Sequence, residues 1–517
     1  MELPATPGTT CYKVIVSASA GVKRWTACAV LAAVLVGGCS APARKPGTTS
    51  AVSLAAWGPC ATTESMPDSG GAHTSVECST LTVPFDYTRP GGPSFRIPVV
   101  RISSKAQKPK LLLTNPGGPG ISGVDDLRSN LEYFEKFSDA YTVVSFDPRG
   151  VGASVPAIQC LDDQQRQAIF NQPSAPTSDA DMKRATELAT GIGDSCKRQF
   201  GDALNHIGTA DVARDMDEIR RALGFDQINY LGFSYGTFLG AVYADMFPKQ
   251  TDRLVLDSVM DPMLDYQEVR HGQAQGMQLS ITAFVEDCLR RSDCPLTGPS
   301  DQALQQISGI VGTLDGQPYV GSDGRTLSGA RMLALVESSQ YFPESGWPAL
   351  RETLRHAVAK QWPAVVDAAY SPKLMVNPAD SEYLSVVCID FATTRDPEKP
   401  KRLAQTWAME SPISGANRAW SLEPCETWPV PPVREPGPVD PQGAGPVLIL
   451  NTTGDPATPL AWAQSLHGQI KNSTLVLAPA QGHIASSQNA CAQDTLVAFL
   501  MTGTLPPDRV FNCPPNK

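Results

Sequence analysis

The sequence predicts an α/β fold in which helices flank a mostly parallel central sheet that carries a large helical cap insertion. Three observations predict it. Short apolar runs typical of buried strands alternate with amphipathic helical stretches in the first half of the chain. Residues 266–435 then show helical patterns and Pro-rich loops with few strand-like runs. Strand-like sequence resumes at residues 446–451 and 473–478, so an insertion fits better than a tandem domain.

The composition indicates a large folded protein that does not bind nucleic acid. Of 517 residues, 42% are hydrophobic and 18% are charged, which excludes global disorder. The net charge is −10 and the chain has no basic runs, whereas phosphate contact needs clustered Lys and Arg. We divide the folded part into a first core segment at residues 57–265, the cap at 266–435 and a second core segment at 436–517.

The N-terminus has the order of a lipoprotein signal peptide, which we assign to residues 1–39. Lys23 and Arg24 precede an apolar run that ends in Gly-Gly-Cys39. This ending resembles the lipobox of bacterial lipoproteins, in which the cysteine becomes the lipid-modified first residue of the mature protein. Residues 40–56 are rich in Ala, Pro, Thr and Ser and are expected to form a flexible tether. The sequence therefore predicts export and lipid anchoring on the outer side of the cell membrane, with ordinary secretion and an incidental Cys39 as the alternative.

Cysteine usage also supports export. Three of the thirteen cysteines lie in the targeting segment, which leaves an even ten. These form no Cys-x-x-Cys pairs and have no histidines at ligand spacing, so disulfides are favoured over a zinc site, and we expect no metal or other cofactor. Sequence alone does not fix the connectivity. We expect sequential pairing, in which each bridge closes a loop inside or beside one module: Cys60–Cys78, Cys160–Cys196, Cys288–Cys294, Cys388–Cys425 and Cys491–Cys513.

The segments before the insertion alternate between strand-like and helical patterns. Strands are expected at 82–87, 95–101, 110–114, 141–146, 228–233 and 253–257, and helices at 211–223 and 237–246. The polar stretch 157–201 is flanked by two cysteines, and we expect it to be an excursion on the surface.

The sequence around Ser234 has the pattern of a nucleophile elbow. Gly232-x-Ser234-x-Gly236 lies between a β-prone run and a helical pattern. A serine on such a sharp turn exposes its hydroxyl, and small residues two positions before and after it let the backbone pass close to itself. We therefore predict that Ser234 is a catalytic nucleophile.

A Gly-rich loop at residues 115–120 follows an early strand. Backbone N–H groups in such a loop can stabilise an oxyanion, and we expect Gly117 and Gly118 to donate together with the N–H of Tyr235, which follows the nucleophile. A phosphate-binding loop is the alternative, but the loop lacks the Gly-Lys-Ser/Thr ending that phosphate binding requires.

Two later loops supply an acid and a base. Asp455 follows one of the two late strands, and His483 follows the other. The chain order Ser, Asp, His is that of an α/β-hydrolase fold and differs from the chymotrypsin-like and subtilisin-like orders. We therefore predict a triad in which His483 accepts the proton of Ser234 and Asp455 holds the imidazole.

Both roles have rivals in the sequence. Asp257 and Asp261 also follow a strand, and either is an alternative acid. His206, His356 and His467 lie in helix-like or polar surroundings, where a packed or solvated side chain is expected.

Several motifs resemble a known family. Asn-Pro-Gly-Gly-Pro-Gly at 115–120, Asp-Pro-Arg-Gly-Val-Gly at 147–152, Gly-Phe-Ser-Tyr-Gly at 232–236, Gly-Asp-Pro-Ala-Thr-Pro at 454–459 and Gly-His at 482–483 are similar to those of the secreted tripeptidyl aminopeptidases of actinobacteria, in the proline-iminopeptidase group of α/β-hydrolases. With its lipoprotein start, the chain also resembles mycobacterial cell-envelope members described as carboxylesterases or proteases. The resemblance implies the same triad and a helical cap whose acidic groups hold the free α-amine of the substrate.

We therefore expect an envelope-anchored serine hydrolase that cleaves short peptides, tripeptides by the resemblance, from the free N-termini of peptide or protein substrates. Carboxylates of the cap must then lie near the substrate ammonium to offset its desolvation. Glu344, Glu382 and Asp390 are the candidates, because they neighbour aromatic and apolar residues. The alternatives are a carboxylesterase acting on acyl esters and a non-catalytic envelope scaffold that has kept the fold.

Overall fold

The structure is a computed structural model that describes residues 52–61, 76–371 and 380–516. The predicted signal peptide, Cys39 and residues 40–51 of the predicted tether lie outside the described residues. None of the helices in these ranges combines the length and the apolar character that a membrane span requires.

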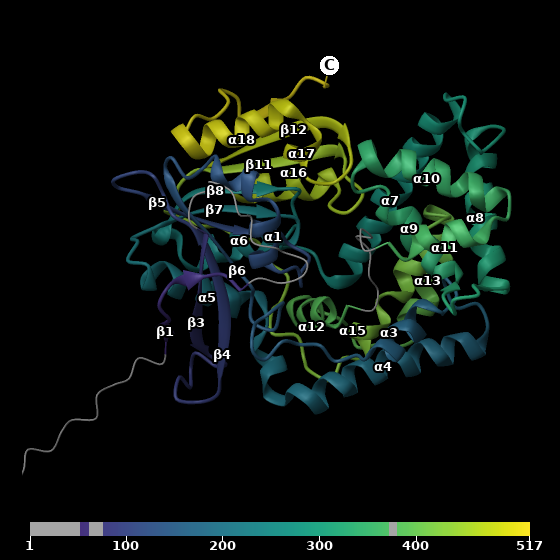
Figure 1. Cartoon of the computed structure of the whole chain (residues 1–517), viewed down its shortest axis with the longest axis horizontal. Helices are drawn as coiled ribbons and strands as arrows, with labels where there is room; N and C mark the ends of the chain where they lie inside the picture. The colour runs from purple at the N-terminus through teal and green to yellow at the C-terminus, as the bar shows by residue number, and fades with distance from the viewer. Residues whose placement is uncertain (1–51, 62–75, 372–379, 517) are drawn as a thin grey trace, which may run out of the picture. The chain divides into compact units, whose positions relative to one another are not determined.

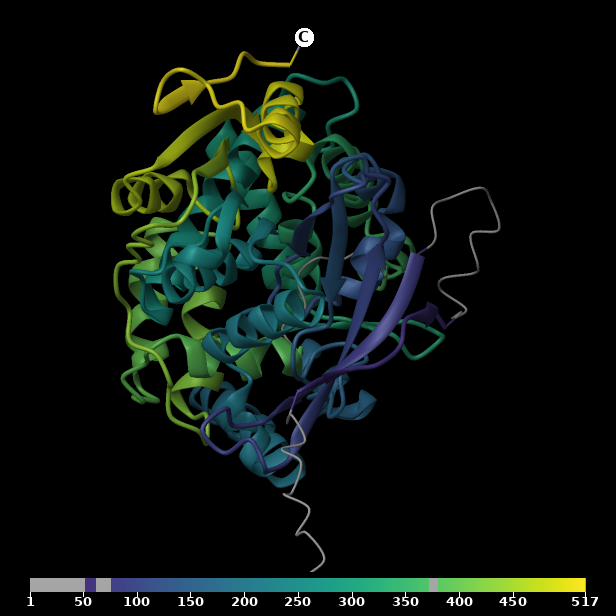
Figure 2. The ribbon, with the colours of Figure 1, turned by 90° about the vertical axis from the view of Figure 1, so that its left-hand side faces the viewer.

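An 11-stranded sheet runs through the described chain (Figure 1). Its strands lie in the order β1-β3-β4-β6-β5-β7-β8-β11-β12-β13, and β2 pairs with β3. All neighbours from β6 to β13 pair in parallel, whereas the pairs from β1 to β6 are antiparallel. The long strands β3 and β4 stand out in purple and blue in Figure 2. The bounds are β1 Ser53–Leu54, β2 Gly58–Pro59, β3 Val76–Pro84, β4 Ser94–Ile102, β5 Lys110–Asn115, β6 Tyr141–Phe146, β7 Ile228–Phe233, β8 Thr251–Asp257, β11 Val447–Gly454, β12 Ser473–Gln481 and β13 Val510–Asn512.

Helices cover both faces of the sheet because its parallel strands are apolar on both sides. In β5, Leu111 and Leu113 pack into the core cluster that contains α5, α6 and α16, whereas Leu112 packs into the cluster of α1, α2 and α18. The predicted α/β fold with a mostly parallel sheet is thereby confirmed. The helices of this part are α1 Gly123–Ser129, α2 Leu131–Glu135, η1 Gly201–His206, α5 Thr209–Ala222, α6 Tyr235–Met246, η2 Pro248–Gln250, α16 Leu460–Gln469, α17 Ala485–Gln488 and α18 Ala490–Thr502.

Between β8 and β11 the chain is mostly helical. Helices α7 to α11 share an apolar core of their own, to which Phe284, Val336 and Leu354 contribute. The elements of this segment are α7 Tyr266–Leu289, α8 Ser300–Gly316, β9 Tyr319–Val320, β10 Thr326–Leu327, α9 Gly329–Ser338, α10 Pro343–Val358, α11 Trp362–Ala369, α12 Ser381–Asp390, α13 Lys399–Glu410, α14 Gly415–Trp420 and α15 Glu423–Glu426. Because it interrupts the sheet in sequence, we treat this segment as the cap.

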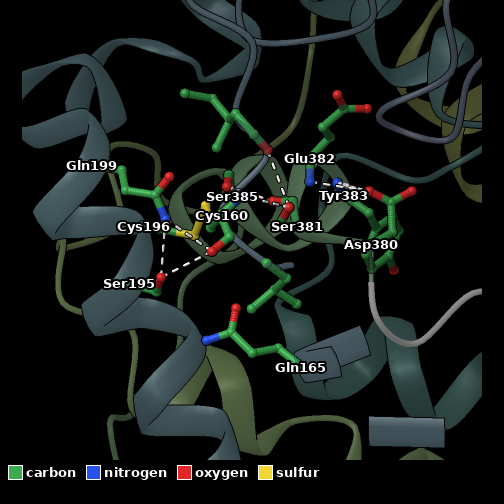
Figure 3. Close-up of a disulfide and its surroundings, with 12 residues drawn as sticks. Cys160, Gln165, Ser195, Cys196, Gln199, Asp380, Ser381, Glu382, Tyr383 and Ser385 are labelled. Atoms are coloured by element: carbon green, nitrogen blue, oxygen red, sulfur yellow. Dashed lines mark hydrogen bonds between the residues drawn. A yellow bond between two sulfur atoms is a disulfide. The ribbon is translucent and has the colours of Figure 1, made fainter. Parts of the chain in front are cut away.

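The polar stretch between β6 and α5 contains the helices α3 (Asp163–Phe170) and α4 (Asp179–Phe200), which precede η1. A disulfide between Cys160 and Cys196 ties the start of this excursion to α4. At the same point the hydroxyl of Ser381, the first residue of α12, accepts the N–H of Cys160 (3.1 Å) and donates to the carbonyl of Ile158 (3.1 Å) (Figure 3). The excursion is therefore fastened to the cap, and α4 also packs against α15.

Five disulfides join the ten cysteines of the described chain. They link the pairs given by sequential pairing: Cys60–Cys78, Cys160–Cys196, Cys288–Cys294, Cys388–Cys425 and Cys491–Cys513. This number of bridges suggests an extracellular protein.

Candidate active site

Ser234 lies on the turn between β7 and α6. Its φ is 55°, in the left-handed region that strains a residue other than glycine. A Cβ atom on Gly232 would lie 2.4 Å from the carbonyl oxygen of Gly236, and one on Gly236 would lie 2.6 Å from that of Asn115. Only glycine fits at these two positions, so the turn itself requires the sequence pattern around the serine.

His483 and Asp455 lie in neighbouring loops, after β12 and β11. Nδ1 of His483 lies 2.9 and 3.0 Å from the two carboxylate oxygens of Asp455. Oδ1 of Asp455 also accepts the N–H groups of Ala457 (2.9 Å) and Thr458 (2.8 Å). The carboxylate is thereby fixed, and it favours the imidazole tautomer that carries its proton on Nδ1 and leaves Nε2 as the base.

Nε2 of His483 is buried and has no hydrogen-bond partner within the described ranges. His483 and Ser234 line the same cavity, so the unpartnered base faces a space that it shares with the serine. Tyr341 of the cap packs edge-on against the imidazole, with ring centroids 5.4 Å apart, and its carbonyl oxygen accepts the N–H of His483 (2.8 Å). The cap therefore helps to hold the histidine in place.

The two rival acids have other partners. Asp257 accepts the first two N–H groups of α17 (2.7 and 3.0 Å), and burial raises the pKa of its carboxyl to about 6. Asp261 accepts the side-chain amide of Gln469 (2.9 Å). Of the three acids, Asp455 is the one that is hydrogen-bonded to His483.

The rival histidines also have other surroundings, and none of them lines the cavity. His206 lies 3.8 Å from Asp211, and His356 lies 2.9 Å from Glu352 on the same helix. Nδ1 of His467 lies 2.8 Å from the hydroxyl of Ser473.

Of the proposed oxyanion donors, Gly117 and Tyr235 lie beside Ser234 and Gly118 lines the same cavity, and the role of Gly117 needs a correction. Tyr235 is the first residue of α6, so its N–H has no partner inside the helix. Gly117 approaches it closely, since a Cβ atom on Gly117 (φ 97°) would lie 3.1 Å from the Tyr235 nitrogen. The N–H of Gly117, however, donates to the side-chain oxygen of Asn115 (3.0 Å) and so stabilises its own loop. We therefore keep the N–H groups of Gly118, which lines the cavity, and Tyr235 as the proposed donors.

A cavity of about 930 Å³ surrounds Ser234 and His483. Core loops, cap helices and the excursion all contribute to its wall. Its volume suits a ligand the size of a short peptide. Part of the lining is apolar, from Ile169, Leu188, Ala189, Ile192, Leu333 and Trp420, and the charged lining residues are Asp126, Asp181, Arg270, Glu337, Asp380, Arg418 and Glu423.

None of the three acids chosen from the sequence for amine binding lines this cavity. Glu344 is exposed in the first turn of α10. Glu382 lies outside the cavity beside Gly120, where burial, with Asp380 adding to it, raises the pKa of its carboxyl to about 7. The prediction for these two residues is corrected, because Glu344 is exposed and the carboxyl of Glu382 interacts with Gln159 and the backbone of Gly152.

Asp390 is a structural link between the cap and the nucleophile elbow. Its carboxylate accepts the N–H (2.9 Å) and the hydroxyl (2.5 Å) of Thr209 at the start of α5, and it lies 3.5 Å from the hydroxyl of Tyr235. Burial raises the pKa of this carboxyl to about 6. Its apolar sequence neighbours reflect burial between α12 and α6, not an opening to substrate.

Two of the five carboxylates that line the cavity are buried, Glu337 and Glu423, and sequence reasoning missed both. Glu423 is 2% exposed, and neither of its oxygens has a hydrogen-bond partner in the described part of the chain. Burial raises the pKa of this carboxyl, and an interaction with the nearby hydroxyl of Thr186 on α4 offsets part of that rise. Glu337 forms an ion pair with Arg418 through Oε2, while its Oε1 has no hydrogen-bond partner in the same ranges. The sequence holds a weak signal for Glu423 alone. Cys425, two residues later, is joined by a disulfide to Cys388 of α12, so the segment that carries Glu423 is held against another part of the cap.

The family model described as the alpha/beta hydrolase fold matches residues 110–490. That range includes Ser234, Asp455 and His483. Among the described residues, no three His, Cys, Asp or Glu side chains gather in a way that could hold a metal ion.

Curated relatives match most of the chain. Serine protease Hip1 of Mycobacterium tuberculosis is 30% identical over 508 residues, which cover 93% of this chain and 96% of the relative. Tripeptidyl aminopeptidase of Streptomyces coelicolor is 30% identical and matches 86% of this chain and 84% of its own. Carboxylesterase B of Mycobacterium tuberculosis is 32% identical, over 89% of this chain and 90% of its own. The names of these relatives cover a protease, an aminopeptidase and an esterase.

Proposed function

This chain belongs to the alpha/beta hydrolase family, as a serine hydrolase of the group of Hip1, tripeptidyl aminopeptidase and carboxylesterase B, and on this premise we propose that it removes tripeptides from free N-termini. One observation carries the proposal. Glu423 is a buried carboxylate without hydrogen-bond partners in the described chain, and it lines the cavity that Ser234 and His483 also line. A buried carboxylate without a partner is costly, and a substrate ammonium would satisfy it.

The proposed chemistry follows from the positions of the triad. Nε2 of His483 takes the proton of Ser234 as the hydroxyl oxygen attacks the scissile carbonyl carbon. The N–H groups of Gly118 and Tyr235 stabilise the oxyanion that forms, and Asp455 stabilises the imidazolium. His483 then returns the proton to the leaving amine, which departs and leaves an acyl-enzyme. Water, activated by the same histidine, hydrolyses the acyl-enzyme and releases the short peptide.

A contact between the excursion and the cap supports a short acyl site. The N–H and the hydroxyl of Ser174 each donate to Asp315 of α8 at 2.6 Å. The side-chain amide of Asn417 in α14 donates to the carbonyl of Ser174, also at 2.6 Å. Because Ser174 and Asn417 both line the cavity, this contact closes part of its wall. A wall of this kind limits how many residues fit between Ser234 and Glu423, as an exopeptidase requires.

Paired reporters test the proposal. A tripeptidyl reporter with a free N-terminus should be cleaved far better than its N-acetylated twin, since acetylation removes the charge that Glu423 would bind. Equal cleavage of both, or cleavage only inside long blocked chains, would contradict an exopeptidase. A fluorophosphonate should also label Ser234, and failure to label would favour a non-catalytic scaffold.

An esterase is the second candidate function. Carboxylesterase B is among the relatives, and part of the cavity wall is apolar, as an acyl chain would need. Esters and peptides use the same acyl-enzyme chemistry. Strong preference for simple acyl esters over every free-amine peptide would establish this alternative.

We also propose that the protein is exported and anchored through a lipid on Cys39. The motif around Cys39 supports the anchor, and the five disulfides suggest an extracellular site of action. Its substrates would then be peptides or proteins of the cell envelope. Cys39→Ala should release the protein from the membrane fraction, whereas unchanged membrane association would contradict the anchor.

A further inference from the structure

Arg270 is a buried guanidinium group in the wall of the catalytic cavity. It lies in the second turn of α7 and is 8% exposed. Its Nε donates to the hydroxyl of Ser421 (2.7 Å), and its Nη1 donates to the side-chain oxygen of Gln273 (2.7 Å). Both acceptors are neutral, and no ion pair joins Arg270 to a carboxylate of the described residues. Since arginine does not lose its proton in proteins, this charge stays in the cavity wall.

The groups around Arg270 do not neutralise it. Glu337 is the carboxylate whose charge acts on Arg270, and Glu337 already forms an ion pair with Arg418. Three tyrosines complete the surroundings: Tyr266, Tyr341 and Tyr383. Phenols are neutral near pH 7, so two guanidinium groups share one carboxylate. A buried charge without compensation is unfavourable, so an additional anion would be stabilised here.

Hydrogen bonds place Arg270 next to the catalytic triad. Gln273, which accepts a hydrogen bond from Arg270, donates one to the carbonyl oxygen of Ala457 (3.1 Å). The N–H of Ala457 in turn donates to Asp455. One turn further along α7, a Cβ atom on Gly276 would lie 3.1 Å from the carbonyl oxygen of Asp455. The guanidinium therefore lies beside the loop of the triad acid, and it lines the same cavity as Ser234.

We propose that Arg270 binds a carboxylate of the substrate. The inference rests on the proposed function and narrows its substrates to short peptides that carry a positive charge at the N-terminus and a negative charge near the scissile bond. The ammonium of the N-terminus is bound by Glu423, and a carboxylate near the scissile bond is bound by Arg270. The carboxylate comes either from an aspartate or glutamate side chain or from the C-terminus of a peptide that ends just beyond the scissile bond.

The chain offers a matched control in Arg331. This arginine is also buried in the cap, at 4% exposure, but it does not line the cavity. It stacks on the rings of Phe170 and Tyr370, and Nη2 donates to the side-chain oxygen of Gln167 (3.1 Å). Arg331→Gln therefore removes a buried guanidinium without changing the cavity wall. Its activity shows how far the loss of a buried arginine acts only through the stability of the fold.

Two series of free-amine peptides test the proposal. In one, tripeptidyl reporters carry Glu or Gln at each position in turn, and in the other, tetrapeptides end in a free or an amidated C-terminus. The wild type should favour the carboxylate member of one series in kcat/KM, on the order of 10- to 100-fold. Arg270→Gln should abolish that ratio, Arg270→Lys should keep part of it, and Arg331→Gln should keep all of it. The series that shows the effect identifies the source of the carboxylate.

The outcomes separate this inference from the proposed function. Hydrolysis with no charge preference in either series, or a preference that Arg270→Gln leaves unchanged, would overturn the role of Arg270 and leave the exopeptidase intact. If no peptide is hydrolysed, the proposed function fails, and binding still decides the inference. Calorimetry on Ser234→Ala should then show tighter binding of the carboxylate peptide, and the added Arg270→Gln change should remove the difference. Equal affinities would overturn the proposal.

Discussion

The two sides of the catalytic cavity differ in how their charged groups are satisfied. On the core side, Asp455 is hydrogen-bonded to His483 and to two backbone N–H groups, and Asp257 accepts the first two N–H groups of α17. On the cap side, Glu423 has no hydrogen-bond partner in the described chain, and Arg270 bonds only neutral oxygens there. The two core carboxylates are satisfied without a ligand, whereas Glu423 and Arg270 have no partner of opposite charge in the described chain.

This difference separates chemistry from recognition. Groups that move protons act fastest when they are already oriented, and backbone N–H groups hold the core carboxylates in place. Buried polar groups without partners are rare in native proteins, and they suggest a ligand when they line a cavity. We therefore expect variants of the triad to reduce turnover of every substrate, and variants of Glu423 and Arg270 to change which substrates are used.

The largest expected effect comes from the triad. Ser234→Ala or His483→Ala should lower kcat by about 10,000-fold or more, with the fold intact, because the residues act as one unit. Asp455→Asn should cost about 1,000- to 10,000-fold, since it removes the carboxylate that orients the imidazole. Hydrolysis of a simple p-nitrophenyl ester measures these losses without involving Glu423.

Asp257→Asn is the matched control for the triad acid. Asp257 is as deeply buried as Asp455, but its carboxylate binds the backbone of α17. This variant should keep most of the activity of the wild type. A severe loss with Asp257→Asn and a mild one with Asp455→Asn would reverse the assignment.

The next largest effect is a difference in unfolding free energy between variants that lack one of two cap disulfides. Cys388–Cys425 joins α12 to α15, which carries Glu423, and closes a sequence separation of 37, whereas Cys288–Cys294 closes only 6. From loop entropy, alanine at both cysteines should cost about 4 kcal/mol of unfolding free energy for the first bridge and about 2 kcal/mol for the second.

Urea unfolding measures both disulfide variants. Loss of Cys388–Cys425 should also lower the cleavage of free-amine reporters more than that of esters, because the position of Glu423 depends on it. Loss of Cys288–Cys294 should leave the ratio of these two activities unchanged. If the two disulfide variants change the ratio of free-amine to ester cleavage equally, the position of Glu423 does not depend on the Cys388–Cys425 bridge.

A smaller effect tests the cap carboxylate itself. Glu423→Gln should lower kcat/KM for a free-amine tripeptidyl reporter by about 10- to 100-fold, since a charge-assisted hydrogen bond to the ammonium is lost. Cleavage of the N-acetylated twin should not change. Glu344→Gln is the control, because Glu344 is exposed and outside the cavity. Equal losses for both reporters, or a loss with Glu344→Gln, would contradict amine binding by Glu423.

The sequence is sufficient to predict the sheet and the triad, because both depend on local patterns. Strand 141–146 was predicted with the bounds of β6, since an apolar run between turn residues is a local signal. The strand expected at 82–87 was placed wrongly, because β3 ends at Pro84 and the side chain of Asp86 accepts the N–H of Thr88 in a turn. The order Ser, Asp, His is likewise readable from the chain.

The cap carboxylates could not be predicted in the same way. Which acid faces the cavity depends on how α12, α14 and α15 pack against the excursion, and these contacts are distant in sequence. Asp390 and Glu423 both follow apolar residues, yet the first is bound by Thr209 while the second is left without a partner in the described chain. The excursion was expected to be polar surface, but α4 and its neighbours line the cavity. Long-range packing, not local pattern, decides these roles.

The smallest expected effect is a pH dependence of stability on the core side. Burial raises the pKa of the Asp257 carboxyl from 3.8 to about 6. The folded state therefore binds more protons than the unfolded state in this interval, so the contribution of Asp257 is fully present below pH 3.8 and is lost as the pH rises through about 6. The unfolding free energy of the wild type relative to Asp257→Asn should fall by about 1–3 kcal/mol across this window. Urea titrations at several pH values, in a Ser234→Ala background to prevent proteolysis, measure the difference. A constant difference would show that the two N–H groups of α17 outweigh burial and keep Asp257 charged throughout.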